Sequence, residues 1–384
     1  MLFSVDDLAG HAGVSVQSLE RLSADLPTGA GKLYESWTAR KKRGGIREII
    51  KPGLRLHIVT KNLARSFNTQ LPYVAPDHVH GFVRERSAFS NASQHLGQKC
   101  VLRVDLEDFF PSISSAMVKA CLEAQGYDEK AAELAVSIVT IGGKLPIGLS
   151  TSPFLSNLAF LNTDNSLVDY SQKEGLSFTR YVDDLTFSGD VTDRHLANII
   201  KILDDANWSV NTYKTAFMRR GGRQYVTGLY VGESDRPHIP RKTKRQMRWI
   251  SHMIEKFGYE TYWESFGGER DEMHRKRLLG WACYIFAVDP DLGYPLLRTF
   301  YNMIPEEYGG PPEWGHRSRD LIARVSRAYE PGEELPAPTP EVVDLAHQGK
   351  KLHALAVYKN LNPGVSIYQA KDVIDGLRVR KPSS

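Results

Sequence analysis

The residues with the clearest chemical potential are two adjacent acids, Asp183 and Asp184. They lie between the runs 178–182 and 185–189, whose β-branched and aromatic side chains favour strands, whereas Asp is tolerated where a chain reverses. We therefore predict a β-hairpin with the acids at its turn. Two carboxylates held close together repel each other unless a cation lies between them, so the pair predicts a site for a hard cation such as Mg²⁺. The alternative is an exposed Asp-Asp turn.

A third acid, Asp105, lies at the end of the predicted strand 100–106, although it could instead cap a helix. Further along, residues 145–153 read Leu-Pro-Ile-Gly-Leu-Ser-Thr-Ser-Pro. Thr151 or Ser152 can cap a helix there, because a proline in the first turn suits a helix start. That helix leads directly into the predicted hairpin.

Length, composition and charge narrow the class of protein. At 384 residues and 41% hydrophobic content, the chain can fold around one large core or two to three smaller ones. No apolar run is long enough to span a membrane and the N-terminus lacks the order of a signal peptide, so we predict a cytoplasmic protein with no membrane partner. Positive charge is clustered at 40–55 and 241–248. Such clusters bind phosphate backbones, although a solvated helix face is an equally simple explanation.

The strands alternate with helices as far as the acids and beyond, which predicts an α+β arrangement, and helical patterns dominate from Pro240 onward. The elements expected before the acids are two N-terminal helices, a hairpin over 40–52, a helix from Leu54, a short helix within 79–95, a helix capped by Ser114 or Ser115, and a helix capped by Asp128. Those expected after the acids are a helix over 193–206, a single alternating strand over 223–231, and helices over 241–257, 275–288, 292–303, 341–360 and 367–378, with a flexible crossing at 305–340.

Asp105, the 145–153 stretch and Tyr181-Val182-Asp183-Asp184 occur in the order found in the palm of reverse transcriptases. The chain resembles that family over about residues 30–310. Within it, the chain is most similar to bacterial retron reverse transcriptases. Asn91-Ala92-Ser93-Gln94-His95 matches their Asn-Ala-x-x-His segment, and Val226-Thr227-Gly228 matches their Val-Thr-Gly motif.

The resemblance implies a right-hand polymerase fold with fingers, a palm of antiparallel sheet plus helices, and a helical thumb. It also implies RNA-directed DNA synthesis from deoxynucleoside triphosphates, on a dedicated structured non-coding RNA that is both template and primer and stays with its DNA product. Defence against phage, with an effector protein, is a further implication. The implied domains are N-terminal helices (1–35), fingers (36–98), a palm (99–235) with fingers helices inserted at about 128–148, a thumb (236–310), and a linker with a helical tail (311–384).

Nucleotidyl transfer needs an activated 3′-hydroxyl, an aligned triphosphate and a neutralised leaving pyrophosphate, which two metal ions can supply together. The family positions make Asp105 and Asp183 the metal ligands, with Asp184 contributing to one ion. The carbonyl of Leu106 could reach the ion that carries the nucleotide. The expected ions are two Mg²⁺, for which Mn²⁺ can substitute.

Three further positions match family roles in nucleotide selection and catalysis. Phe110 lies where reverse transcriptases place the aromatic gate that excludes a 2′-hydroxyl, although either Phe110 or its neighbour Phe109 must be a core residue. Arg47, with help from Arg40, Lys41 or Lys42, matches the cations that clasp the triphosphate, and guanidinium suits such bidentate contact. Lys214 matches a lysine near the leaving pyrophosphate and is a candidate general acid, with a plain surface lysine as the alternative.

Other residues are expected to contact nucleic acid. The retron-like spacing of Asn91 and His95 suggests positioning of template or RNA, although both could be satisfied core residues. The basic residues of the thumb should grip the duplex backbone, because phosphate contacts dominate affinity; they are Arg241, Lys242, Lys244, Arg245 and Arg248.

Two residues depart from the family pattern. Ile147 replaces the usual Gln of Leu-Pro-Gln-Gly, so the role of that Gln must fall to the backbone or be lost. Val182 replaces the usual Ala of Tyr-Ala-Asp-Asp. These departures leave open a divergent defence-associated reverse transcriptase with template-independent or protein-primed synthesis. A non-catalytic RNA-binding scaffold is the alternative from another class, and three converging acids argue against it.

Overall fold

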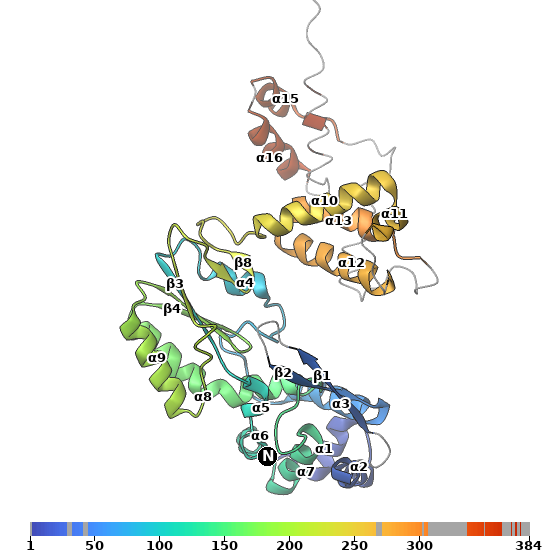
Figure 1. Ribbon diagram of the computed structural model, residues 1–384, viewed down its shortest axis with the longest axis vertical. Coiled ribbons are helices and arrows are strands. Elements are labelled where there is room, and N and C mark those ends of the chain that lie inside the picture. The colour runs from blue at the N-terminus through green and yellow to red at the C-terminus, as the bar shows by residue number, and fades with distance from the viewer. Residues whose placement is uncertain are drawn as a thin grey trace, which may run out of the picture. The chain divides into compact units, whose positions relative to one another are not determined.

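An antiparallel sheet is the frame that brings the three predicted acids to one place (Figure 1). Its strands are β3 (Cys100–Asp105), β4 (Ser177–Tyr181), β5 (Asp184–Gly189) and β6 (Ala216–Arg219), in the order β4-β5-β3-β6. β4 and β5 form the predicted hairpin, and β3 pairs with β5 on one side and β6 on the other. Helices and this sheet together confirm the predicted α+β class.

The chain divides into two compact units, Met1–His238 (unit 1) and Ile239–Ser384 (unit 2). The structure is a computed structural model. The residues it describes are 2–28, 33–40, 45–265, 271–301, 303–305, 336–348, 350–362, 370, 373, 374 and 377. Most of the expected crossing at 305–340 and of the expected helix 367–378 therefore lies outside the described residues.

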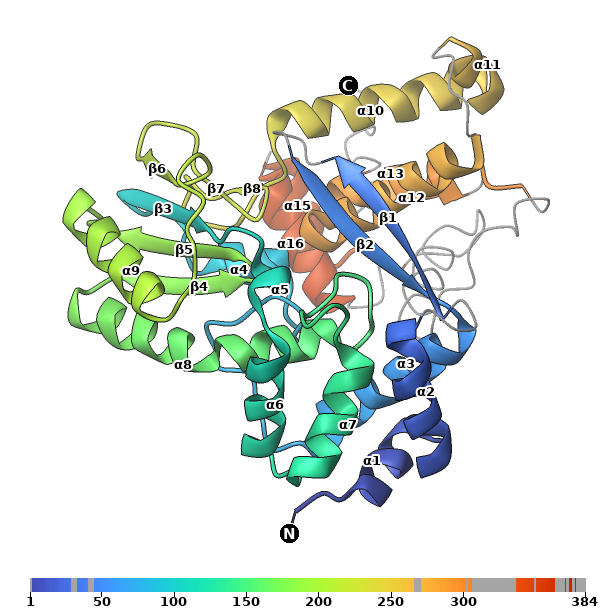
Figure 2. The same ribbon diagram turned by 60° about the horizontal axis from the view of Figure 1, so that its bottom comes forward.

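The helices of unit 1 form two groups around one hydrophobic core (Figure 2). One group follows the sheet, and its members are α4 (Ala88–Ser93), α5 (Phe109–Ser112), α8 (Ser152–Lys173) and α9 (Asp193–Asp205). The other packs together beyond the end of the sheet, and its members are α1 (Val5–Ala12), α2 (Val16–Thr28), α3 (Leu54–Gln70), α6 (Ser115–Ala124) and α7 (Glu129–Val139). Side chains of Ser114 and Asp128 cap α6 and α7, as the sequence predicts.

A second hairpin in unit 1, β1 (Tyr34–Arg40) and β2 (Ile46–Pro52), is mostly exposed but is anchored at one point. Ile50 N donates to the Ile147 carbonyl at 2.8 Å. Gly148 is required beside it, because its φ is 121° and a Cβ there would lie 2.0 Å from the Ile50 carbonyl oxygen. Ile147 thus uses its backbone to hold the hairpin, although its side chain cannot hydrogen-bond.

The region after α9 differs from the prediction. The single strand expected over 223–231 is wrong, because the chain forms a tight hairpin of β7 (Tyr225–Val226) and β8 (Leu229–Tyr230). Thr227 and Gly228 form its turn, with φ of 48° and 83°, and two positive φ values match the hairpin turns that follow strand twist. The short strand β6 was not predicted, because four residues with one aromatic carry little strand signal.

Unit 2 is helical in its described part. Its helices are α10 (Arg241–Phe257), α11 (Tyr259–Glu264), α12 (Asp271–Val288), α13 (Pro290–Tyr301), α15 (Pro340–His347) and α16 (Lys351–Leu361). α12 and α13 pack closely, and α15 and α16 have a small apolar cluster of their own around Val342 and Tyr358. Among the described helices of the chain, none has the length and apolar character needed to cross a membrane.

Candidate active site

The three acids meet where β3 ends and β5 begins. Asp105 and Asp184 are opposite each other in the sheet, and Asp183 precedes Asp184 in the hairpin turn. Leu106 N donates to the Asp183 carbonyl at 3.0 Å, and Asn211 N donates to the Asp105 carbonyl at 2.8 Å. These backbone bonds fix the junction, so the three carboxylates start from one end of the two central strands of the sheet. We call these three residues the junction acids.

Burial makes negative charge costly at two of the junction acids, Asp183 and Asp184. Burial raises the pKa of Asp184 to about 7, with Arg103 opposing this rise and the charges of Asp105 and Asp183 adding to it. The pKa of Asp183 is also raised, first by burial and then by Asp105. Because an opposite charge favours the ionised form of a carboxyl group, a cation at the junction would relieve this cost.

The chain supplies some of that positive charge itself. Lys214 Nζ donates to Asp105 Oδ2 at 2.7 Å. Arg103, which points from the same strand as Asp105, places its Nε 3.7 Å from Asp184 Oδ1. That distance is too long for a hydrogen bond, so the pairing of Asp184 is weak.

The residues at the junction fit a divalent metal ion. Carboxylate oxygens are the ligands that hard divalent cations prefer. Asp184 Oδ1 is buried without a hydrogen-bond partner among the described residues. A buried acceptor of that kind is costly to leave unpaired, and a metal ion would satisfy it.

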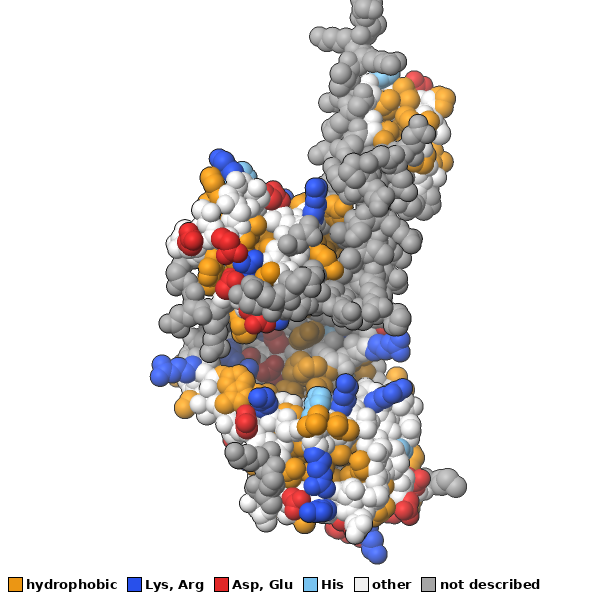
Figure 3. All heavy atoms as spheres, turned by 90° about the vertical axis from the view of Figure 1, so that its right-hand side faces the viewer, with side chains coloured by type: hydrophobic (Ala, Val, Ile, Leu, Met, Phe, Trp, Pro, Cys, Tyr) orange, Lys and Arg blue, Asp and Glu red, His pale blue; other side chains and the backbone are white. Residues whose placement is uncertain are grey.

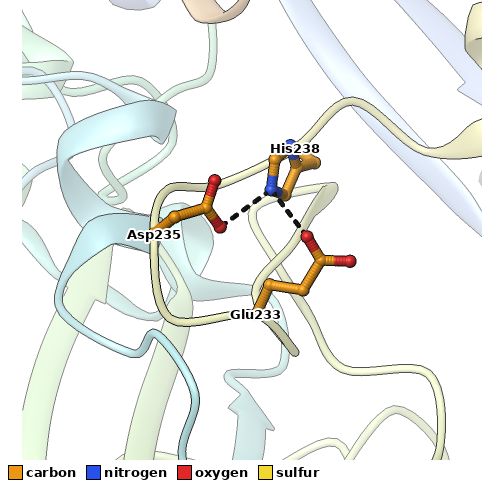
Figure 4. Close-up of side chains that lie close together, drawn as sticks. All are labelled: Glu233, Asp235 and His238. Carbon is orange, nitrogen blue, oxygen red and sulfur yellow. Dashed lines mark hydrogen bonds and ion pairs between the residues drawn. The ribbon is translucent and has the colours of Figure 1, made fainter. Parts of the chain in front are cut away.

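A second group of acids lies on the loop after β8 (Figure 4). Within the described part of the chain, only Glu233, Asp235 and His238 place one ligand atom each within 4.8 Å of one another. His238 Nε2 lies 3.1 Å from a carboxylate oxygen of each acid, and its backbone pairs with that of Tyr230. The imidazole therefore pairs both acids within the chain and closes the loop. The junction acids do not meet the same distance limit.

The two adjacent phenylalanines of α5 have different surroundings. Phe109 is buried, and its ring packs 5.7 Å from Phe160 and 5.5 Å from Trp208, centroid to centroid. Phe110 is only half-buried, and its ring lies 6.3 Å from that of Phe82. Phe109 is therefore the core aromatic, while the gate role of Phe110 stays a prediction.

Arg47 lies exposed on β2, on the hairpin that Ile147 anchors. Its charge lowers the pKa of Asp183 against the effect of burial. Lys41 and Lys42, which were expected to help, lie outside the described residues, whereas Arg40 ends β1.

Further cations follow on the adjacent helix. α3 contains no acid, and its exposed basic side chains are Arg55, Lys61 and Arg65. Figure 3 shows Lys and Arg side chains spread among apolar ones over one face of unit 1. This unit therefore offers positive charge outside the junction as well.

Asn91 and His95 require a correction. Both side chains are fully buried, so neither can reach a phosphate or a base directly. His95 instead bridges two strands, with Nδ1 2.7 Å from Ser188 Oγ and Nε2 2.7 Å from Thr179 Oγ1. Burial lowers the pKa of His95 to about 3, so the ring is neutral. The spacing that suggested nucleic-acid contact corresponds to a support behind the β4–β5 hairpin.

The predicted thumb cations lie on α10 in unit 2. Buried apolar residues such as Met247 and Ile254 face inward on this helix. Lys244 differs from the other cations, because its Nζ donates to Asp289 Oδ2 at 3.0 Å. The exposed cations are Arg241, Lys242, Arg245 and Arg248.

Sequence reasoning missed two arginines around the junction. Arg103 lies in the apolar strand β3 and pairs weakly with Asp184. Arg180, two residues before Val182, is fully buried and bonded to Asp164 and Asn157 of α8. A charged residue inside an otherwise apolar strand was the available signal in both cases, because burying a charge is costly unless it is paired.

Known proteins resemble this chain in sequence. A family model described as reverse transcriptase (RNA-dependent DNA polymerase) matches residues 39–254. The chain is 31% identical over 314 residues to the retron Mx65 reverse transcriptase of Myxococcus xanthus, covering 76% of this chain and 70% of that one. It is 27% identical over 316 residues to the retron Ec86 reverse transcriptase of Escherichia coli, covering 80% and 92%. A solved foamy viral protease-reverse transcriptase with an RNA/DNA hybrid matches at 18% identity and TM-score 0.38, covering 77% and 33%.

Proposed function

The chain belongs to the reverse transcriptase family, as a retron-type RNA-directed DNA polymerase, and we propose that it extends a primer on a partner RNA at the junction acids. The single observation that carries the site assignment is the pairing of Asp105 with Asp184 across β3 and β5, with Asp183 at the adjoining turn. This arrangement places three carboxylates at one end of the two central strands of the sheet. A scaffold that only bound RNA would have no use for them.

We assign Asp105, Asp183 and Asp184 as ligands of divalent ions, with Leu106 contributing its carbonyl. The ions, two Mg²⁺ for which Mn²⁺ can substitute, would activate the 3′-hydroxyl and neutralise charge on the triphosphate. The buried carboxylates favour binding, because their mutual repulsion is relieved when cationic charge arrives.

The remaining roles belong to side chains around the junction. Arg47 would hold the triphosphate, since a guanidinium makes bidentate contacts with phosphate oxygens. Phe110 would lie under the sugar and exclude a 2′-hydroxyl. Lys214 would protonate the leaving pyrophosphate, and its contact with Asp105 keeps its ammonium group at the edge of the site.

Unit 2 would bind the duplex through α10. The exposed cations on this helix can contact phosphates without reading sequence, so recognition of the partner RNA would depend on its shape and single-stranded bases. We assign α10–α13 to the thumb and the sheet of unit 1 to the palm. The role in phage defence and the effector protein stay predictions from the family resemblance.

Recovery of bound nucleic acid from the native host tests the proposal. The purified protein should carry one RNA species joined to or paired with a short DNA copy of an internal RNA segment. Samples would be split, treated with ribonuclease or deoxyribonuclease, and sequenced, and the same preparation would be tested for primer extension with Mg²⁺ or with a chelator. DNA without a templating RNA would contradict the proposal in favour of template-independent synthesis. Absence of any DNA, with no extension in Mg²⁺, would favour a scaffold.

A further inference from the structure

A buried polar network lies behind the turn that holds Asp183. Arg180 of β4 is fully buried, and its guanidinium donates to both carboxylate oxygens of Asp164, at 2.8 Å from Nε and 2.6 Å from Nη2. Its remaining nitrogen, Nη1, donates to Asn157 Oδ1 at 3.0 Å and to the Val182 carbonyl at 3.2 Å. One side chain therefore connects α8 with the backbone of the turn itself.

The backbone at this point is unusual. Val182 has a φ of 63°, which is rare for a β-branched residue because its side chain crowds the backbone. Such conformations persist only where the surroundings enforce them. The hydrogen bond from Arg180 to the Val182 carbonyl is one such restraint, and it acts on the residue directly before Asp183.

The same network holds a second segment against the turn. His80 N donates to the Arg180 carbonyl at 2.8 Å, and Asn157 Nδ2 donates to the Gly81 carbonyl at 3.0 Å. Gly81 packs so closely that a Cβ would lie 2.5 Å from Val182 N. The next residue, Phe82, also has a positive φ, of 60°, and its ring lies edge-on to that of Phe110.

A buried ion pair of this kind needs an explanation other than stability. Desolvation of two charges offsets most of their attraction, so a well-packed apolar pair would often be as stable. The guanidinium of Arg180 and the amide of Asn157 add directional hydrogen bonds, each of which fixes a separate group. Here the fixed groups are the backbone carbonyls of Val182 and Gly81, and these two residues pack directly against each other.

We propose that Arg180, Asp164 and Asn157 are positioning residues that hold the turn bearing Asp183 and the Gly81–Phe82 segment in one fixed relation. The inference rests on the proposed function of the junction acids and of Phe110. Its consequence is that metal-ligand geometry and sugar selection are coupled through one buried side-chain network. Weakening the network should disturb both together, although none of its members touches a substrate.

The test measures single-nucleotide incorporation by the full-length protein on an RNA template with an annealed DNA primer and Mg²⁺. Asn157→Ala removes both bonds of the amide. It should lower kcat by about tenfold or more, because small misplacements of reacting groups cost up to about 100-fold. KM for the primed template should stay unchanged, and selectivity for deoxyribonucleotide over ribonucleotide should fall. Arg180→Lys, which keeps a cation beside Asp164 but cannot make all four bonds, should show the same pair of defects and carries the test if Asn157→Ala does not fold.

Thr163→Val is the matched control. Thr163 lies on the same helix, and its Oγ1 accepts a buried hydrogen bond from Trp208 Nε1 at 2.9 Å. This variant should lose stability yet keep kcat and sugar selectivity. The proposal is overturned if folded Asn157→Ala or Arg180→Lys protein retains both properties, or if Thr163→Val loses them equally. Failure of the wild-type protein to extend the primer would instead overturn the proposed function.

Discussion

The acids at the β3–β5 junction and those on the loop after β8 have very different surroundings. Glu233 and Asp235 are exposed, and His238 pairs with both of them. The hydrogen bond with His238 lowers the pKa of Asp235, so this carboxyl group ionises readily. The acids at the β3–β5 junction are buried or half-buried, and the pKa values of Asp183 and Asp184 are raised instead.

This difference distinguishes acids with a structural role from acids suited to bind a ligand. Glu233, Asp235 and His238 lie close enough together to hold a metal ion, but the acids are already paired with the imidazole. The junction acids repel one another, and Asp184 Oδ1 lacks a hydrogen-bond partner among the described residues. Because perturbed carboxylates gather where function requires them, proximity alone is a weaker guide to a site than unrelieved charge.

The largest difference between the two groups should appear when one acid in each is replaced by its amide. Asp105→Asn should lower DNA synthesis by about 10³-fold or more, because losing a metal ligand removes several kcal/mol of transition-state stabilisation. Asp235→Asn should leave synthesis close to the wild-type level. Steady-state primer extension on an RNA template would be compared for both. Equal losses in the two variants would erase the distinction between the groups.

Phe109 and Phe110 differ in a similar way, because Phe109 is buried in the core and Phe110 is only half-buried. Phe110→Ala should weaken discrimination against ribonucleotides by about 10- to 100-fold, because contacts that fill such a space contribute on that scale. Phe109→Ala should instead destabilise unit 1 by about 3–5 kcal/mol, as for other buried aromatic residues. Incorporation of both nucleotide types and thermal unfolding would be measured for each. If only stability changes in Phe110→Ala, the gate assignment is wrong.

The cations of α10 should also differ in their contribution to nucleic-acid binding, according to whether they are paired within the chain. Arg248→Ala should reduce the slope of log affinity against log salt concentration by about 1, because one phosphate contact is lost. Lys244→Ala should change that slope less, because Lys244 is already paired with Asp289. Binding of an RNA/DNA hybrid would be titrated at several salt concentrations. A larger slope change for Lys244→Ala would contradict the assignment of the exposed face.

The smallest effect concerns His95, a residue fully satisfied within the fold. Its folded pKa of about 3 lies below the unfolded value of about 6.5, so the unfolded chain binds an extra proton between these limits. Stability should therefore fall as pH drops below about 6.5, with His95 contributing up to about 1.4 kcal/mol per pH unit. His95→Gln should make this dependence shallower, as measured by urea unfolding at pH 7, 6 and 5. An unchanged slope would show that the pKa of His95 is the same in the folded and the unfolded chain.

Local patterns were sufficient to predict the elements that carry the acids. The strand-favouring runs around Asp183, the strand before Asp105 and the capping residues Ser114 and Asp128 each act over a few residues, and the structure confirms them. Thr227-Gly228 was misjudged, because a two-residue turn between short strands looks like one strand by alternation alone.

Contacts between distant segments could not be predicted in this way. The pairing of Arg180 with Asp164 and the burial of His95 depend on how β4, α8 and α4 pack together. The family motif marked His95 as important without saying whether its ring faces solvent or the core. Its partners Thr179 and Ser188 lie more than eighty residues away in the sequence, so no local pattern records the contact.

Primer extension by the Asp183→Ala/Asp184→Ala double variant, measured beside its affinity for the same primed RNA, tests the assignment of the junction acids most directly. DNA synthesis should be abolished, because the divalent ions lose two carboxylate ligands. Folding and binding to the primed RNA should be nearly unchanged, because the cations of α10 remain. Undiminished extension by the folded double variant would contradict the assignment of the junction as the site of synthesis.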